Sequence, residues 1–341
     1  MSMLNKAYID LNILRQNVKN IKAKLSPSVK FCAVVKADGY GHGAEQIANA
    51  IYKECDYFAV ALVQEGISLR QSGIDKDILV LTPPVNSDLK DAVFYDLTLS
   101  VDNVSVLDKI EREAKRQSKR IKIHIKYNTG MNRLGVDNLE QLETIAKKII
   151  SSKYLYLDGL FSHLAFPENK KSTNIAQNKF LLANNLIKGY NNKAICHLSA
   201  SGGFLAKVYS DMVRIGILMY GYKPFPSKFV SVKPIMKIYA PLVKKRTLKK
   251  GDNCLYGSAK LNCAKRLSIV RFGYADGLPR QKTARQFNNR CMDLTALEKA
   301  KVTKKGVLIM GNADVVAKKY NTISYEVLTK CAIRSQKIYI R

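Results

Sequence analysis

The stretch "VVKADGYGHG" at residues 34–43 joins the end of an apolar run to a lysine, three glycines, a tyrosine and a histidine. The run that it closes, "FCAVVKA", is short and apolar and is bounded by a glycine-rich segment, which is typical of a buried strand. A lysine at the end of a buried strand either extends into water or takes part in chemistry. Lys36 is therefore the first candidate functional residue.

Seven further apolar runs follow, and longer amphipathic stretches separate them. The runs are "YFAVAL", "DILVLT", "LTLSV", "IKIHIKY", "YLDGLFSHL", "AICHLSAS" and "MVRIGIL". Between them, stretches such as "GAEQIANAIYKE", "VQEGISLRQSG" and "DNLEQLETIAKKIISSK" carry apolar residues at helical spacing. Alternating strands and helices predict a parallel sheet, and eight strands predict an α/β fold with a (β/α)8 TIM-like barrel over residues 1–225.

The pattern changes after Pro224 and Pro226. Alternating stretches such as "SVKPIMKIYAPLV", "RLSIVRFGYADG" and "KGVLIMG" appear without long helical stretches between them. We therefore predict a second, mainly β domain over residues 226–341. The first strand, at about residues 1–11, is a candidate to pack with this β domain rather than with the barrel.

The chain is strongly basic, with a formal net charge of +30. From Pro226 onward, 26 Lys and Arg residues stand against 6 Asp and Glu residues. The basic residues occur in twos and threes between strand-like runs, not in one tract interleaved with aromatic residues, which favours a solvated basic face over a nucleic-acid site. A nucleic-acid-binding protein stays a rival hypothesis, and it predicts binding that weakens steeply with salt.

Cysteine and histidine usage argues against disulfides and metal sites. The seven cysteines are widely spaced without a C-x-x-C pair, and the four histidines lack H-x-x-x-H spacing. No apolar run approaches the roughly 20 residues that span a bilayer, and the start "MSMLNKAYIDLN" lacks the apolar core of a signal peptide. We expect a cytoplasmic protein with no metal and no membrane partner.

The surroundings of Lys36 are suited to a carbonyl cofactor. Nucleophilic lysines form Schiff bases with carbonyl compounds, including pyridoxal phosphate. Gly39, Gly41 and Gly43 would let the backbone approach a ligand closely, and Tyr40 offers a phenol nearby. A free lysine has a pKa of about 10.4, so a lysine that acts as a base near neutrality needs a lowered pKa.

The motif "VVKADGYGHG" resembles the cofactor-lysine motif of alanine racemases, which are pyridoxal-phosphate enzymes of fold type III with a barrel and a β domain. Further motifs resemble the family in the same order along nearly the whole chain. They are "KYNTGMNRLG", "HLSAS", "RIGILMYG", "LYG", "GYADGLPR", "RCMD" and "TISYE". The resemblance implies a homodimer with shared active sites that interconverts L- and D-alanine, an isomerase that supplies D-alanine for peptidoglycan and cell-wall synthesis.

The resemblance also implies roles for individual residues. Lys36 would hold the cofactor and act as one base, and Tyr256 from the partner's β domain would act as the other. Arg214 would face the pyridine nitrogen, with His163 orienting it by a hydrogen bond. Other positions match cofactor-binding residues (Tyr40, Ser201, the amides of Gly216 and Ile217, and Tyr325), substrate-binding residues (Arg133, Met292 and Tyr274) and a lysine that is carbamylated in many members (Lys126).

Two departures from the family pattern bear on specificity. Asn128 stands where the family commonly has Asp, and Ala200 stands where Asn is common. The first changes a charge near Arg133 and Lys126, and the second removes an amide from the cofactor pocket. A serine or broad-specificity racemase and a non-catalytic pyridoxal-phosphate carrier are therefore alternatives, and Tyr256 distinguishes the carrier because single-domain carriers lack the β domain.

Overall fold

The computed structural model describes residues 4–253, 256, 260–280, 290–298 and 300–341. By its internal contacts the chain divides into two compact units. One, here called the barrel unit, comprises Arg15–Gly39 and Ala44–Lys233. The other, the strand unit, comprises Met1–Leu14, Tyr40–Gly43 and Pro234–Arg341. Each unit is described separately below.

Eight parallel strands form the sheet of the barrel unit, and all eight coincide with the predicted apolar runs. They are β2 (Lys30–Val34), β3 (Tyr57–Val60), β4 (Ile78–Val80), β5 (Thr98–Val101), β6 (Ile121–Lys126), β7 (Leu155–Phe161), β8 (Ile195–His197) and β9 (Met212–Ile215). Neighbours in sequence are neighbours in the sheet, and β9 pairs with β2. A parallel bridge between Ala200 and Arg214 joins the chain after β8 to β9 and closes the barrel. The predicted barrel is confirmed.

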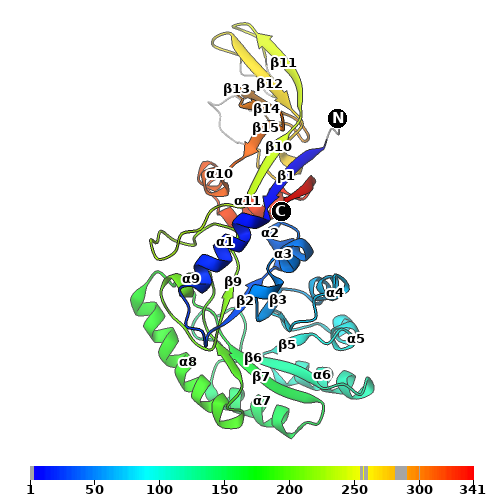
Figure 1. The fold of residues 1–341 in the computed structure, drawn as a ribbon, viewed down its shortest axis with the longest axis vertical. Helices are drawn as coiled ribbons and strands as arrows, with labels where there is room; N and C mark the ends of the chain where they lie inside the picture. Colours follow the sequence, from blue (N-terminus) through cyan, green and yellow to red (C-terminus); the bar gives the residue numbers. More distant parts are fainter. Residues whose placement is uncertain (1–3, 254–255, 257–259, 281–289, 299) are drawn as a thin grey trace. The chain divides into compact units, whose positions relative to one another are not determined.

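Helices cover the outside of this sheet, and Figure 1 shows α3 to α7 following one another around it. In α7, Leu142, Ile145, Ala146 and Ile149 are buried at the spacing of one helix face, because that face packs on the sheet. The helices are α1 (Leu11–Lys22), which begins in the strand unit, α3 (Ala44–Ala50), α4 (Val63–Gln71), α5 (Leu89–Phe94), α6 (Val104–Arg116), α7 (Leu139–Ser151), α8 (Lys170–Tyr190) and α9 (Ser201–Leu205), with short 3-10 turns at Tyr52–Glu54 and Asn86–Asp88.

The described residues of the strand unit form two sheets. One has the order β14-β15-β10-β1-β16, and the other has the antiparallel order β11-β12-β13. The strands are β1 (Asn5–Asp10), β10 (Met236–Ala240), β11 (Leu242–Leu248), β12 (Lys265–Val270), β13 (Thr295–Glu298), β14 (Val302–Thr303), β15 (Gly306–Met310) and β16 (Ser335–Ile340). The N-terminal strand β1 lies between β10 and β16, antiparallel to the first and parallel to the second.

Two helices of the strand unit, α10 (Ala313–Tyr320) and α11 (Ser324–Cys331), were not predicted from the sequence. Each has eight residues, which is little more than two turns and too short for a clear helical period. The side chain of Asn312 caps α10 by accepting a hydrogen bond from the Asp314 amide at 2.8 Å. Within the described residues, no helix combines the length and apolar character needed to cross a membrane.

Candidate active site

Lys36 opens a left-handed turn directly after β2. Ala37, Asp38 and Gly39 have φ of 51°, 52° and 61°, and the Gly39 amide donates to the Val35 carbonyl at 2.8 Å. For Ala37 and Asp38 this conformation costs roughly 1–2 kcal/mol each, whereas glycine adopts it freely. Such strain persists only where surrounding contacts hold it, and it is concentrated at functional sites.

Two carboxylates hold the turn. Glu65, in the first turn of α4, accepts from the Ala37 amide at 2.5 Å and from the Ala61 amide at 2.7 Å. Asp38 accepts from the Ala44 amide at 2.9 Å, which fixes the start of α3. These bonds keep Lys36 at the carboxyl end of a barrel strand, where active sites of this architecture are built.

The next two glycines, Gly41 and Gly43, pack closely against other parts of the strand unit. A Cβ on Gly41 would lie 2.5 Å from the Leu328 carbonyl oxygen in α11, and a Cβ on Gly43 would overlap the Tyr339 hydroxyl in β16. Both also have positive φ. Close packing within the strand unit therefore requires glycine at both positions, and the prediction that they let a ligand approach stays a prediction.

Four cations gather at the carboxyl ends of the barrel strands. They are Lys36, Lys126, Arg133 and Arg214. Burial, followed by Arg133 and Arg214, lowers the pKa of Lys36, and Glu65 opposes the shift. Burial and the same two arginines lower the pKa of Lys126 to about 7. A buried excess of positive charge favours an anionic ligand, and the lowered pKa makes the Lys36 amine more available as a nucleophile.

The guanidinium of Arg214 makes four hydrogen bonds. One terminal nitrogen lies 2.6 Å from His197 Nδ1 and donates to the His197 carbonyl at 2.9 Å, and the other donates to the carbonyls of Ser162 at 2.5 Å and Leu198 at 3.1 Å. Among the described residues, no acceptor meets the Arg214 Nε–H. The buried guanidinium therefore keeps one donor for a ligand atom.

The predicted hydrogen bond from His163 to Arg214 was wrong, since His197 takes that place. His197 ends β8 and pairs with Phe161 of β7, which in turn pairs with Lys126 of β6. These three side chains form a row, with the Phe161 ring stacked on the His197 ring at an interplanar angle of 9°. His163 follows the end of β7, and burial with Arg214 and Lys126 lowers its pKa to about 3, so its imidazole is neutral.

A group of backbone amides lies after β9. The Ser201 hydroxyl oxygen accepts from the amides of Gly216 at 3.2 Å and Leu218 at 3.4 Å. Within the described part of the chain, the Ile217 amide makes no hydrogen bond, although Ile217 is buried. A buried amide without a partner is costly, so this group fits a phosphate or another anion.

In the strand unit, Tyr40 and Tyr325 lie near each other, with ring centroids 6.0 Å apart. Burial raises the pKa of Tyr325 to about 12, so its phenol keeps its proton and remains a hydrogen-bond donor. A neutral phenol of this kind suits an anionic acceptor better than a cation.

Asn128, which stands where the family commonly has Asp, organises the loop that carries Arg133. Its side-chain oxygen accepts from the amides of Gly130 at 3.0 Å and Asn132 at 3.1 Å, and its nitrogen donates to Asp137 at 2.8 Å. Arg133 is exposed, yet it lowers the pKa of both Lys36 and Lys126. The departure at Asn128 therefore retains a structural role in the loop.

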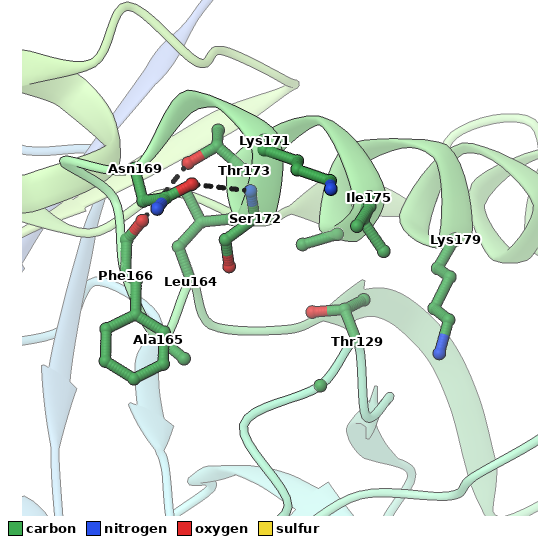
Figure 2. A pocket seen from close by; sticks show the side chains of 12 residues that line it. Thr129, Leu164, Ala165, Phe166, Asn169, Lys171, Ser172, Thr173, Ile175 and Lys179 are labelled. Carbon is green, nitrogen blue, oxygen red and sulfur yellow. Dashed lines mark hydrogen bonds between the residues drawn. The ribbon is translucent and has the colours of Figure 1, made fainter.

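A cavity of about 400 Å³ opens beside this loop, next to the start of α8. Figure 2 shows side chains of α8, among them Ile175 and Lys179, above the loop that carries Thr129, with Leu164 and Phe166 at one side. Asn169 caps the helix through the Ser172 amide at 2.9 Å. The exposed Phe166 and Ile175 give this cavity an apolar rim.

Tyr256, Met292 and Tyr274 are exposed side chains of the strand unit, with 66%, 54% and 39% of their surface accessible. The Met292 carbonyl accepts from the Ala275 amide at 3.0 Å, and the Cys291 carbonyl accepts from the Tyr274 amide at the same distance. Met292 and Tyr274 therefore belong to one local structure. Leu255 and Gly257, which flank Tyr256 in the "LYG" motif, lie outside the described residues.

Two family models match this chain, one for the N-terminal domain of alanine racemase over residues 9–224 and one for its C-terminal domain over residues 235–339. The chain belongs to the alanine racemase family. Among known relatives, the alanine racemase of Francisella tularensis subsp. novicida is 34% identical over 294 residues, which is 84% of this chain and 80% of the relative. The alanine racemase of Treponema denticola is 34% identical over 289 residues, or 81% and 76% of the two chains.

Solved structures of alanine racemases have the same fold. The Clostridium difficile enzyme matches with a TM-score of 0.91 and 30% identity, covering 100% of this chain and 96% of that one. A Bacillus anthracis alanine racemase with bound L-Ala-P matches with a TM-score of 0.91 and 26% identity, covering the same shares.

Three residues of this candidate site were not assigned from the sequence. Phe161 and His197 lie in quoted apolar runs, and Glu65 follows another. The signal for Phe161 and His197 was the place of each at the end of a parallel strand, since such ends meet at one edge of a barrel. Among the described residues, no group of three or more His, Cys, Asp or Glu side chains is arranged to hold a metal ion.

Proposed function

We propose that this chain interconverts L- and D-alanine with pyridoxal 5'-phosphate held covalently by Lys36. The observation that carries the proposal is the amine of Lys36, fixed on a strained turn at the end of a barrel strand with its pKa lowered by burial and two arginines. When bound, the cofactor withdraws electrons from the α-carbon of an amino acid and makes the α-proton labile. Side chains and backbone amides of the protein would bind the cofactor, transfer the protons and hold the substrate.

We assign the remaining cofactor contacts to hydrogen-bond donors near Lys36 and at the ends of the barrel strands. Arg214 would donate its Nε–H to the pyridine nitrogen, and because an arginine does not readily give up a proton, that nitrogen would stay largely unprotonated. Ser201 with the amides of Gly216 and Ile217 would hold phosphate oxygens, joined by the phenols of Tyr40 and Tyr325. His163, as a neutral imidazole, would contact the ring without adding charge.

Racemisation needs a second base. One group removes the α-proton from one face and another returns a proton to the opposite face, so two bases must flank the substrate. We assign these roles to Lys36 and to Tyr256 of the partner subunit. The exposure of Tyr256 agrees with a side chain that acts on a neighbouring protomer in a homodimer, where two shared active sites form.

Arg133 would hold the substrate carboxylate, and Met292 and Tyr274 of the partner strand unit would narrow the entrance. A solved relative from Clostridium difficile carries cycloserine, and the Bacillus anthracis relative carries L-Ala-P, both small amino-acid-like compounds. We further propose that the product D-alanine serves peptidoglycan synthesis in the cytoplasm. Serine is the competing substrate, because Asn128 and Ala200 differ from the common family pattern.

Lys126 is the proposed site of carbamylation, in which its neutral amine adds to the carbon of CO₂ and releases one proton. Burial and two arginines lower its pKa to about 7, so the neutral amine predominates above that pH. An ordinary lysine would be about 0.4% neutral at pH 8. With ¹³C-bicarbonate, we expect a carbamate signal in the ¹³C NMR spectrum that grows from pH 6 to pH 8 and is absent from Lys126→Ala.

Lys122 on the same strand provides the matched control for this carbamate signal. Burial opposes its charge, but the ion pair with Asp77 at 2.6 Å outweighs burial and raises the pKa of Lys122. Lys122→Ala should therefore leave the carbamate signal unchanged. An unchanged signal in Lys126→Ala, or no signal in the wild type at pH 8, would contradict the assignment.

The function is tested by chiral chromatography of L-alanine and L-serine after incubation with protein loaded with pyridoxal phosphate. D-alanine in the first reaction supports the proposal, and the serine reaction sets the substrate range. If a cofactor-bound dimer formed neither D-isomer, both racemase readings would fail, and a carrier role would replace them. Formation of D-serine at a rate equal to or above that of D-alanine would overturn the alanine assignment.

A further inference from the structure

A chain of hydrogen bonds runs from Arg214 into the interior of the barrel. His197 Nε2 lies 2.8 Å from His124 Nδ1, and His124 Nε2 lies 2.8 Å from Asp158 Oδ2. The Tyr57 hydroxyl donates to the same carboxylate oxygen at 2.5 Å. Arg214 and His197 are nearly or fully buried, and so are His124, Asp158 and Tyr57.

The hydrogen bonds in this series all run in one donor-to-acceptor direction, from Arg214 to Asp158. A guanidinium only donates, so His197 Nδ1 must accept from Arg214 and His197 must carry its proton on Nε2. That proton is donated to His124 Nδ1, which leaves the His124 proton on Nε2, from where it is donated to Asp158. Both imidazoles are therefore neutral Nε2–H tautomers between a cation and an anion.

The backbone is shaped to place Asp158 in this chain. The register between β6 and β7 shifts after Ile123, so that His124 pairs with Gly159 and Asp158 is left without a partner in the ladder. Such a bulge turns a side chain out of the regular alternation. A Cβ on Gly159 would lie 2.6 Å from the His124 ring, so glycine leaves the space that the imidazole fills.

Asp158 is charged in this position. Burial would raise its pKa, but the hydrogen bonds from His124 and Tyr57, together with Lys122, outweigh burial and lower it. A buried carboxylate needs such partners, and a buried guanidinium needs a compensating anion. Among the described residues, Arg214 hydrogen-bonds to carbonyls and to one imidazole, so Asp158 is the anion connected to it.

We propose that Asp158 and His124 are positioning residues for racemisation, which through His197 fix the orientation of Arg214 and compensate its buried charge. The direction of the hydrogen-bond chain stands on the geometry alone, and only the final step, from Arg214 to the cofactor, rests on the proposed function. A comparable case is the residue that hydrogen-bonds to a metal-binding histidine in metal enzymes. Mutation of such a residue typically lowers metal affinity or activity by about 10–100-fold. We expect about a tenfold fall in kcat for Asp158→Asn, with KM within twofold of the wild type.

The first test is ¹⁵N NMR of histidine-labelled protein without cofactor, which is tractable because the chain has four histidines. His124→Gln and His197→Gln assign the two signals. Each imidazole should show a protonated Nε2 and an unprotonated Nδ1 at pH 7. A protonated Nδ1 on either ring, or a doubly protonated ring, would overturn the proposed direction.

The second test compares Asp158→Asn with Tyr57→Phe, which removes one hydrogen bond to Asp158 but keeps the carboxylate. Tyr57→Phe should retain wild-type kcat and KM within twofold and should keep both tautomers. Equal kcat in the two variants would refute a positioning role for Asp158. If the wild type bound no cofactor, the proposed function would be wrong, but the tautomers measured by NMR would still test the direction of the hydrogen bonds. Failure of the proposed function can therefore be told apart from failure of this inference.

Discussion

Replacing Lys36 with alanine is expected to lower kcat/KM for L-alanine by about 10⁴-fold and to abolish covalent attachment of the cofactor. Two functions are lost together, since the amine both binds the cofactor carbonyl and acts as one base. General acid-base catalysis alone contributes about 10²–10⁴-fold, and covalent catalysis adds to it. The measurement is racemisation kinetics together with intact-protein mass after borohydride reduction of the loaded protein.

Lys30 is the matched control, because it begins the same strand and is exposed at the opposite end. Lys30→Ala should retain wild-type kinetics and the reduced cofactor adduct. A mass adduct that persists in Lys36→Ala would show that another amine holds the cofactor. Full activity in Lys36→Ala would exclude its role as a base.

The barrel could be predicted because its signal repeats. Eight short apolar runs, each followed by a glycine, polar or helical segment, leave few alternatives to a closed parallel sheet. All eight strands of the barrel unit follow these runs in order. In the strand unit, β10, β12 and β15 were expected, whereas the short helices α10 and α11 were not.

The partner of Arg214 could not be chosen from the sequence. His163 and His197 both lie at or just after the ends of neighbouring strands. Which imidazole reaches the guanidinium depends on the register between strands, and the register here includes a bulge in β7. A pattern of residue types does not encode a one-residue shift of this kind.

The left-handed turn at Lys36 could not be predicted from the motif either. The motif drew attention to its three glycines, yet the non-glycine residues Ala37 and Asp38 also adopt positive φ, because Glu65 and Asp38 itself satisfy the amides around them. Tertiary hydrogen bonds thus decide the conformation against local preference. The result is a backbone held by hydrogen bonds directly after the residue that carries the amine.

Tyr256→Phe is expected to lower racemisation of both alanine enantiomers by about 10²–10⁴-fold, since each direction requires a proton transfer at both faces. Exchange of the α-hydrogen with solvent should survive for one enantiomer, because Lys36 still serves its own face. The measurement is the rate of racemisation by chiral chromatography, beside deuterium uptake from D₂O into L- and D-alanine by NMR. Loss of the hydroxyl from an exposed side chain should leave folding unchanged.

Tyr209 of the barrel unit supplies the control, as an exposed tyrosine outside the proposed site. Tyr209→Phe should retain wild-type racemisation and exchange with both enantiomers. Equal loss of exchange for L- and D-alanine in Tyr256→Phe would mean that Tyr256 supports the whole site rather than one face of it. Unchanged racemisation would remove Tyr256 as the second base, and a different group on the face opposite Lys36 would have to take that role.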